Sequence, residues 1–202
     1  MARGVFVVFE GIDASGKSTQ AQRVAERRDA LFTFEPGDTP LGADLRRWLL
    51  DASTTPMTPA TEALLMLADR SDHVRAVIEP ALAAGRSVVS DRFAASTLAY
   101  QGYGRGLDLG ELRAATALAI GECRADLTVL LDIPLEVANE RRARNDEDRF
   151  ESADLAFHER VRDGYLELAR GDGWIVLDAS GDEDDVSAAV DGAVDALAWP
   201  DA

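Results

Sequence analysis

Near the amino terminus, a short apolar run leads directly into a glycine-rich loop and then into a helix-like stretch. Residues 5–9 are β-forming, and residues 17–28 have the apolar spacing of an amphipathic helix. The loop GIDASGKS fits the pattern G-x-x-x-x-G-K-[ST], in which backbone N–H groups and a lysine surround nucleotide phosphates. This unit predicts a triphosphate site formed by Gly11, Ile12, Asp13, Ala14, Ser15, Gly16, Lys17, Ser18 and Thr19, with Ser18 facing Mg²⁺.

The same alternation of short apolar runs and helical patterns continues along the chain. Apolar runs at residues 30–34, 86–90, 127–132 and 174–177 predict further strands, with helical patterns between them. Strands that alternate with helices favour a parallel sheet covered on both faces. The sequence therefore predicts an α/β fold with three layers and a five-stranded parallel sheet, and we expect residues 1–202 to form a single domain.

Two of the predicted helices carry apolar residues that we expect to face the interior. Leu41 and Trp48 belong to the apolar face of one helix, and Leu64 belongs to a longer helix that we expect to bend near Pro80.

Acidic residues outnumber basic ones. The chain has 37 Asp and Glu against 21 Lys and Arg, a formal net charge of −16, so the phosphate backbones of nucleic acids would be repelled. Lys17 is the only lysine, which argues against a guanine-reading GTPase, because that class uses a second lysine in an N-K-x-D motif. We interpret the acidic surface as an adaptation to a salt-rich cytoplasm, a hypothesis that activity measured against KCl concentration tests.

The remaining composition favours a soluble, cytoplasmic protein without membrane partners. No apolar run approaches the roughly 18 to 20 residues that a membrane-spanning helix needs, and the amino terminus becomes polar too early for a signal peptide. The single cysteine, Cys123, is expected to be a small buried thiol. His73 and His158 occupy polar helical positions, where we expect them to be exposed rather than catalytic.

Asp91 and Arg92 follow directly after the apolar run at residues 86–90. In open parallel sheets, ligands bind at the carboxyl ends of the strands, so this pair is placed for chemistry. The guanidinium fork of an arginine suits the binding of a phosphate through paired hydrogen bonds. The alternative is a salt bridge that only caps the strand.

Four blocks of sequence, at residues 9–20, 35–46, 90–102 and 148–151, resemble the thymidylate kinase family. They read FEGIDASGKSTQ, EPGDTPLGADLR, SDRFAASTLAYQG and DRFE, and their spacing also matches along the chain to about residue 180. The resemblance implies the P-loop fold of nucleoside monophosphate kinases with a short lid at about 141–152. It also implies phosphoryl transfer from ATP to dTMP with Mg²⁺, giving ADP and dTDP, and a homodimer.

The resemblance further implies which residues bind the acceptor phosphate and sugar. Arg92 and Arg46 would hold the acceptor phosphate, and Asp91 would lie near the metal and the reacting phosphates. Asp13 would contact the 3′-hydroxyl of the deoxyribose, which gives a carboxylate next to phosphates a favourable partner.

Glu62, Met66 and Arg70 are four residues apart and therefore share one face of their helix. The resemblance assigns Arg70 to the base carbonyl. The family places an aromatic residue four positions before this arginine, where this chain has Met66, so the departure concerns base selectivity. The alternative is a core methionine beside a surface arginine.

Thr97, Tyr100 and Gln101 resemble the residues that read the pyrimidine edge, and Tyr100 would form the wall that excludes a ribose 2′-hydroxyl. Phe34 is a second departure, because the common bacterial pattern has an arginine before E-P-G. Some relatives have a phenylalanine near this point, and we include Phe34 among the substrate-binding residues.

Residues 141–151 are rich in arginine and fit the predicted lid. Phosphoryl transfer needs cations that neutralise charge on the equatorial oxygens, and the family places the extra arginine either in the P-loop or in the lid. Ala14 occupies the P-loop position, which favours the lid type, with Arg144 and Arg149 as catalytic residues and Arg141 in contact with ATP. By itself, a mixture of arginines and acids is also typical of a solvated helix end.

Two alternatives to a thymidylate kinase remain. The first is a kinase for another pyrimidine monophosphate such as dUMP, because Met66 and Thr97 lie where the base is read. The second is a nucleotide-binding regulatory protein without turnover, against which Lys17 and Arg92 argue.

Overall fold

The computed structural model describes residues 3–50, 57–144 and 155–199. The strands are β1 (Phe6–Glu10), β2 (Leu31–Phe34), β3 (Val88–Asp91), β4 (Leu127–Asp132) and β5 (Trp174–Asp178). The helices are α1 (Lys17–Arg27), α2 (Pro40–Leu50), α3 (Pro59–His73), α4 (Glu79–Ala83), α5 (Ala94–Thr97), α6 (Leu109–Ile120), α7 (Leu135–Arg144), α8 (Leu155–Leu168) and α9 (Glu183–Val194). Two π-helical segments, η1 (Val74–Ile78) and η2 (Leu98–Gly104), continue α3 and α5.

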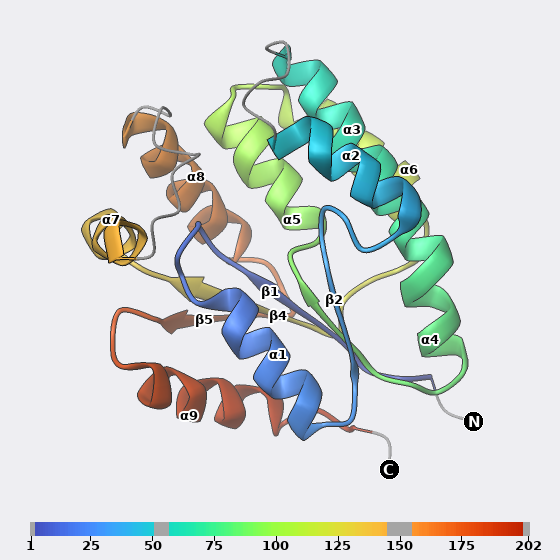
Figure 1. Cartoon of the computed structure of the whole chain (residues 1–202), viewed down its shortest axis with the longest axis vertical. Helices are drawn as coiled ribbons and strands as arrows, with labels where there is room; N and C mark the ends of the chain where they lie inside the picture. Colours follow the sequence, from blue (N-terminus) through green and yellow to red (C-terminus); the bar gives the residue numbers. More distant parts are fainter. Residues whose placement is uncertain (1–2, 51–56, 145–154, 200–202) are drawn as a thin grey trace.

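The five strands form one parallel sheet in the order β2-β3-β1-β4-β5. Phe9 of β1 and Phe34 of β2 both lie opposite Asp91 of β3, so these three strands end at one edge of the sheet. The strand order changes direction at β1, and ligands bind outside the carboxyl ends of strands at such a switch point. Figure 1 shows α1 beside α9, and α2, α3 and α6 grouped together beyond this edge.

The side chains of β1 alternate between two apolar layers. Phe6 and Val8 pack in a cluster with residues of η1 and α4, whereas Val7 and Phe9 pack with residues of α1, α8 and α9. Because both faces of the strand are buried, its sequence is a continuous apolar run. The predicted α/β fold with a five-stranded parallel sheet between helical layers is confirmed.

The helical region before Pro80 changes its hydrogen bonding from α to π. At the end of η1, the N–H of Glu79 donates to the carbonyl of Val74, five residues earlier. Proline has no N–H to continue an α-helical ladder, and a widened turn rearranges the bonds around it.

Three large apolar side chains that were expected to face the interior are exposed. Leu41 is 50%, Trp48 55% and Leu64 65% exposed. α2 and α3 pack against each other, but this contact leaves at least half of each of these side chains exposed. An apolar helical face thus indicates a preferred surface for packing but does not show what covers it.

The prediction that both histidines are exposed is wrong. His73 is fully buried and His158 is 4% exposed. His73 contacts the hydroxyl of Thr33 on β2, and α8, which carries His158, packs against η2. α3 and α8 each pack against more than one other element, so polar neighbours in the sequence did not show that these histidines are exposed to solvent. Cys123 is a buried free thiol, as predicted.

Within the described ranges, the structure contains no helix with the length and apolar character needed to cross a membrane.

Candidate functional site

The loop between β1 and α1 has the backbone geometry of a phosphate cradle. Gly11, Ala14 and Gly16 all have positive φ angles, of 151°, 65° and 87°. These angles turn the chain so that α1 begins at Lys17 with its N–H groups open toward the loop, and a helix amino terminus attracts anions. The loop therefore has a backbone geometry that suits the phosphates of a nucleotide.

Lys17 lies folded over this loop. Its ammonium is 3.4 Å from the carbonyl oxygen of Ile12 and 3.8 Å from a carboxylate oxygen of Asp13. Burial lowers the pKa of Lys17, and the nearby charge of Arg92 lowers it further. A bound phosphate would oppose both effects, because it supplies negative charge at the place where the ammonium lacks water.

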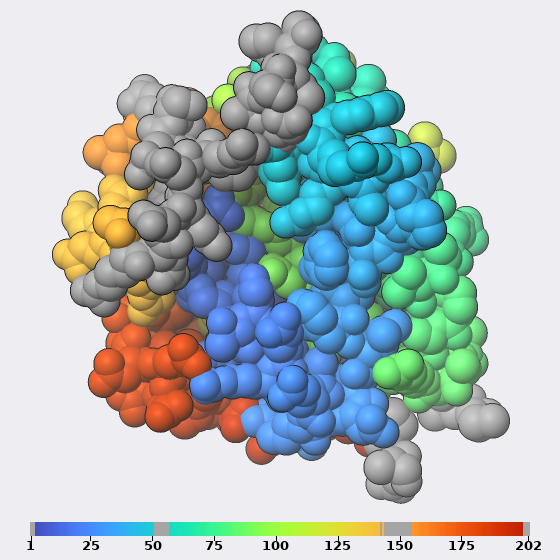
Figure 2. All heavy atoms as spheres, viewed as in Figure 1, coloured from blue at the N-terminus to red at the C-terminus, as the bar shows by residue number. Residues whose placement is uncertain are grey.

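A cleft of about 1370 Å³ opens beside the loop, at the edge where β1, β2 and β3 end. Figure 2 shows the hollow near the middle of the molecule, with dark blue and green atoms at its floor. Most residues predicted for the site line this cleft: Asp13, Ala14, Ser15, Gly16, Lys17, Ser18, Thr19, Phe34, Arg46, Met66, Arg70, Asp91, Arg92, Thr97, Tyr100, Gln101 and Arg141.

The other predicted site residues do not line the cleft or are not described there. Gly11 and Ile12 are buried at the start of the loop, where Gly11 has a positive φ angle. The side chain of Arg144, at the end of α7, is not among the described groups, and Arg149 lies outside the described residues. The predicted lid at 141–152 is thus described only in its first part.

Arg92 lines the cleft directly after β3. Its Nη2 atom donates to Asp13 Oδ1 at 2.6 Å and to the hydroxyl of Tyr100 at 3.2 Å. The Tyr100 hydroxyl in turn donates to the other oxygen of Asp13 at 3.0 Å. An arginine, a tyrosine and a P-loop carboxylate are thus brought together although they are far apart in the sequence.

Ser18 and Asp91 meet at the start of α1. The Ser18 hydroxyl donates to Asp91 Oδ2, and Asp91 Oδ1 is buried without a hydrogen-bond partner among the described residues. Hydroxyl and carboxylate oxygens next to a phosphate cradle are the ligands that Mg²⁺ prefers, together with water and phosphate oxygens. The pair therefore fits the predicted metal. No group of three or more metal-binding side chains occurs in the described part of the chain.

Arg70 is a buried residue and not a surface arginine. It is 2% exposed, and its guanidinium donates to Glu35 at 2.8 Å, to the hydroxyl of Thr97 at 2.6 Å and to the carbonyl of Phe93 at 2.8 Å. Met66 lies one helical turn earlier on the cleft wall. The shared face predicted for residues 62, 66 and 70 is confirmed.

Two further groups close this part of the cleft. Gln101 donates to Glu62 at 2.8 Å, which ties η2 to α3. Arg46 stacks over the ring of Phe34, with its guanidinium carbon 5.5 Å from the ring centre, and donates to the carbonyl of Pro36 at 2.6 Å. The predicted residues Phe34 and Arg46 therefore lie together, on β2 and α2.

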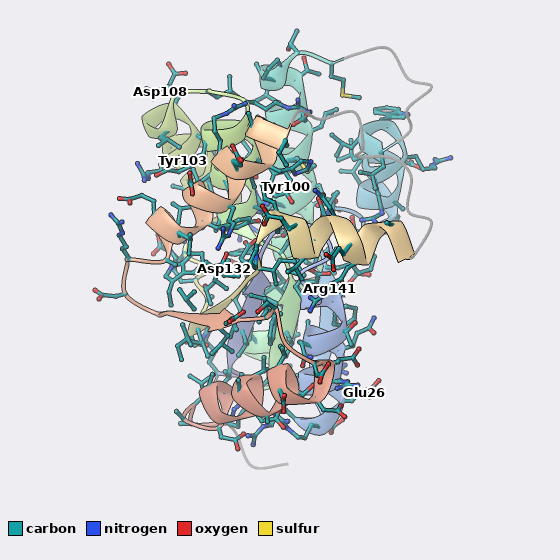
Figure 3. All side chains as sticks on the ribbon, turned by 90° about the vertical axis from the view of Figure 1, so that its left-hand side faces the viewer. Glu26, Tyr100, Tyr103, Asp108, Asp132 and Arg141 are labelled. Carbon is teal, nitrogen blue, oxygen red and sulfur yellow. The ribbon has the colours of Figure 1, made fainter. Side chains whose placement is uncertain are left out.

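Arg141 connects the P-loop to the loop after β5. It donates to the carbonyl of Ala14 at 3.4 Å and to the carbonyls of Ala179 and Gly181 at 2.8 and 3.2 Å. Figure 3 labels Arg141 on α7 and Tyr100 on η2, two of the side chains that line the cleft.

Sequence reasoning missed a buried polar cluster in the wall of the cleft and directly behind it. Glu35 accepts hydrogen bonds from Arg70 and lies 2.9 Å from His73, and Asp69 accepts from the N–H of Gly37 at 3.0 Å. Ser96 and Tyr165 were also missed, and both contact Arg92. The only local signal for Glu35 was its position directly after a predicted strand. The same kind of position had identified Arg92.

Comparison with known proteins identifies one family along most of the chain. The family model described as thymidylate kinase matches residues 9–190. Thymidylate kinase of Desulforudis audaxviator is 51% identical over 175 residues, 84% of this chain and 79% of the relative. Thymidylate kinase of Cereibacter sphaeroides is 48% identical over 200 residues, 93% of this chain and 92% of the relative.

A solved structure agrees as well. The crystal structure of thymidylate kinase from Ehrlichia chaffeensis superposes with a TM-score of 0.77 at 30% identity, and covers 94% of this chain and 98% of its own. The five-stranded sheet, the P-loop cleft and relatives about half identical over most of both chains lead to one conclusion: this chain belongs to the thymidylate kinase family.

Proposed function

We propose that this chain transfers the γ-phosphoryl group of ATP to dTMP and forms ADP and dTDP. One observation carries the proposal: a single cleft contains both the P-loop, with Lys17, and Arg92, and Asp13 contacts both cations. A donor phosphate on the loop and an acceptor phosphate on Arg92 would therefore be neighbours. Positioning and charge neutralisation supply most of the catalysis in phosphoryl transfer.

The donor half of the site consists of the P-loop and the start of α1. The loop N–H groups and Lys17 would bind the β- and γ-phosphates, and Arg141 would contact ATP from α7. Ser18 and Asp91 would hold Mg²⁺, which when bound neutralises phosphate charge and orients the oxygens.

The acceptor half is centred on Arg92. This residue would hold the dTMP phosphate with Arg46, while Asp13 would exchange its bond to Arg92 for the 3′-hydroxyl of the sugar. Tyr100 would pack against the sugar and leave no room for a 2′-hydroxyl. The acceptor phosphate is itself an anionic nucleophile, so no general base is required.

The base would lie against the buried end of the cleft. Arg70 is already fixed by Glu35 and Phe93, which supports a role as a rigid donor to the base carbonyl. Thr97 and Gln101 would read the remaining edge, Met66 would cover one face of the ring, and Phe34 would close the cleft from β2.

Catalytic arginines at the end of α7 and in the segment after it complete the proposal. Arg144 and Arg149 would neutralise transition-state charge in place of the P-loop arginine that Ala14 replaces. Replacing the acting arginine with alanine is expected to lower kcat by about 10³-fold while the fold remains intact. Full turnover of both variants would contradict this assignment.

The experiment that tests the function is an ADP-release assay over a panel of nucleoside monophosphates, in low and high KCl. dTMP is expected to be the best acceptor, and Lys17→Met is expected to lower kcat by at least about 10²-fold. Faster turnover of dUMP or CMP than of dTMP would refute the thymidylate assignment. Absence of turnover with every acceptor would instead favour a nucleotide-binding regulator, and full activity in dilute buffer would contradict the salt-rich cytoplasm.

A homodimer is the assembly that we propose. Four large exposed apolar side chains, Leu41, Trp48, Leu64 and Leu118, lie on the neighbouring helices α2, α3 and α6. Shielding of such a surface by a second copy would remove apolar area from water. Light scattering of the wild type and of Leu118→Glu tests this, and a monomeric wild type would refute it.

We further propose that the chain acts as a single domain in the cytoplasm, where a free thiol and ATP are both expected.

A further inference from the structure

Arg92 has an unusual backbone conformation. Its φ angle is 73°, in the left-handed region, which a residue with a long side chain adopts only when its surroundings hold it there. Its N–H donates to the carbonyl of Phe9 at 2.9 Å, and its own carbonyl accepts from the hydroxyl of Ser90 at 2.7 Å. The backbone is therefore fixed, and the remaining freedom of Arg92 is in its side chain.

A second set of contacts holds the guanidinium from below. Nη1 donates to the hydroxyl of Ser96 and to the hydroxyl of Tyr165, both at 3.1 Å, and to the carbonyl of Gly11 at 3.2 Å. The Tyr165 hydroxyl belongs to α8, far from the P-loop and from β3 in the sequence.

Glu10 lies beneath these hydroxyls and is fully buried at the end of β1. It accepts from the N–H of Phe93 at 3.0 Å, from Ser96 through its N–H at 3.2 Å and its hydroxyl at 2.7 Å, and from the Tyr165 hydroxyl at 2.9 Å. One carboxylate thus connects β1, the turn after β3 and α8.

The chemistry of Tyr165 suits a bridge between this carboxylate and Arg92. Burial raises the pKa of Tyr165 well above its usual range, and the charge of Glu10 raises it further, so the hydroxyl keeps its proton. A protonated hydroxyl donates to Glu10 and still offers a lone pair to the guanidinium. Hydrogen bonds of this kind with ionised groups are among the stronger ones in proteins.

We propose that Tyr165 and Glu10 are positioning residues that hold the guanidinium of Arg92 in the orientation that receives the acceptor phosphate. Tyr165 does not line the cleft, so it acts through Arg92 and not on the substrate. The proposal rests on the proposed function, because it requires that Arg92 binds the acceptor phosphate.

Tyr165→Phe is the decisive variant. It removes only the hydroxyl and retains the ring, which packs edge-on to Tyr100 at a centroid distance of 6.2 Å. We expect kcat/KM for dTMP to fall about tenfold or more, the range expected when a hydrogen bond to a charged group is lost, while KM for ATP changes less than about twofold. A purely structural role would instead lower kcat through a smaller active fraction, leave both KM values unchanged, and so reduce kcat/KM for dTMP and for ATP by the same factor.

Tyr103→Phe is the matched control. Figure 3 labels Tyr103, which lies on η2 one turn after Tyr100, with its ring against Gly164 of α8. Its hydroxyl makes no hydrogen bond within the described part of the chain, and the variant is expected to retain wild-type constants.

A double-mutant cycle with Arg92→Lys separates action through Arg92 from an independent effect. In the Arg92→Lys background, Tyr165→Phe is expected to have little further effect on kcat/KM for dTMP. Fully additive losses, or wild-type constants for Tyr165→Phe, would overturn the proposal. If Tyr165→Phe does not fold, Ser96→Ala, which removes a neighbouring contact to Arg92, takes its place in the same cycle with the same two outcomes. A wild-type chain without turnover on any monophosphate would instead overturn the proposed function and this inference together.

Discussion

Asp69 gives the stability of this protein a pH dependence that can be calculated from the structure. The carboxylate is 1% exposed, and burial, followed by the charge of Glu35, raises its pKa from 3.8 to about 6. A raised carboxyl pKa means that the native state holds the proton more tightly than the unfolded chain does. The native state therefore loses stability as the pH rises through this interval, and the full loss is reached above pH 6.

The magnitude follows from the shift of about two pKa units, each of which corresponds to about 1.4 kcal/mol. Asp69→Asn keeps an oxygen that can accept from the N–H of Gly37 but removes the titration. Integrating from pH 4.5 to 7.5, we expect the unfolding free energy of Asp69→Asn to rise relative to wild type by about 2 kcal/mol.

Urea denaturation of both proteins at several pH values between 4.5 and 7.5 measures this difference. Asp44→Asn, which removes one exposed carboxylate of α2, makes the same change in net charge and serves as the control. A difference between wild type and Asp69→Asn that does not vary with pH would refute the reasoning, even if the variant were more stable at every pH.

Three other predictions concern separate parts of the molecule. Gly192 lies in α9 with open space where a Cβ would be, so Gly192→Ala should stabilise the chain by about 0.5–1 kcal/mol. In Gly164→Ala the new Cβ would lie 2.6 Å from the Tyr103 ring, so this variant should be less stable than wild type by about 1–3 kcal/mol. Urea denaturation measures both free energies of unfolding, and equal effects would contradict the packing. Burial raises the pKa of Cys123 to about 11, so iodoacetamide should alkylate this thiol at pH 8 only after unfolding. Mass spectrometry measures the extent of alkylation, and rapid alkylation of the native protein would contradict the burial of the thiol. Arg46→Ala should raise KM for dTMP about tenfold, whereas Arg47→Ala, which changes the neighbouring exposed arginine, should leave KM unchanged. Equal KM values for the two variants would exclude Arg46 from the acceptor site.

The sheet could be predicted from the sequence because its signals are local. Each strand is a short apolar run between turn residues, and the predicted runs differ from the observed strands by at most two residues at either end. The orientation of the helices was harder to predict. The exposure of Leu64 and the burial of His73 both depend on which elements lie across from α3, and nothing within the helix itself records that.

The residues of the candidate site also divide into those with a local sequence signal and those that only the folded chain brings together. The P-loop and the Asp91–Arg92 pair are short stretches of sequence with a chemical pattern, and the structure brings them to one cleft. The contacts that hold Arg92 and Arg70 join residues far apart in the chain: Glu10 and Tyr165 are separated by 155 positions, and Glu35 and His73 by 38. No periodicity or motif encodes such pairs, so only the folded chain reveals them.

The register of β1 and β3 has a consequence for the two phosphate sites proposed above. Phe9 lies opposite Asp91, so the P-loop and Arg92 leave adjacent strands at the same level, and adjacent strands are about 4.8 Å apart. Under the proposed function, the spacing of backbone hydrogen bonds between these strands sets the distance between the starting points of the donor and acceptor sites, and side-chain substitutions hardly alter it. Helices on the outside can change in sequence and shift in position without changing that distance, whereas an insertion of one residue in either strand would displace one phosphate site relative to the other.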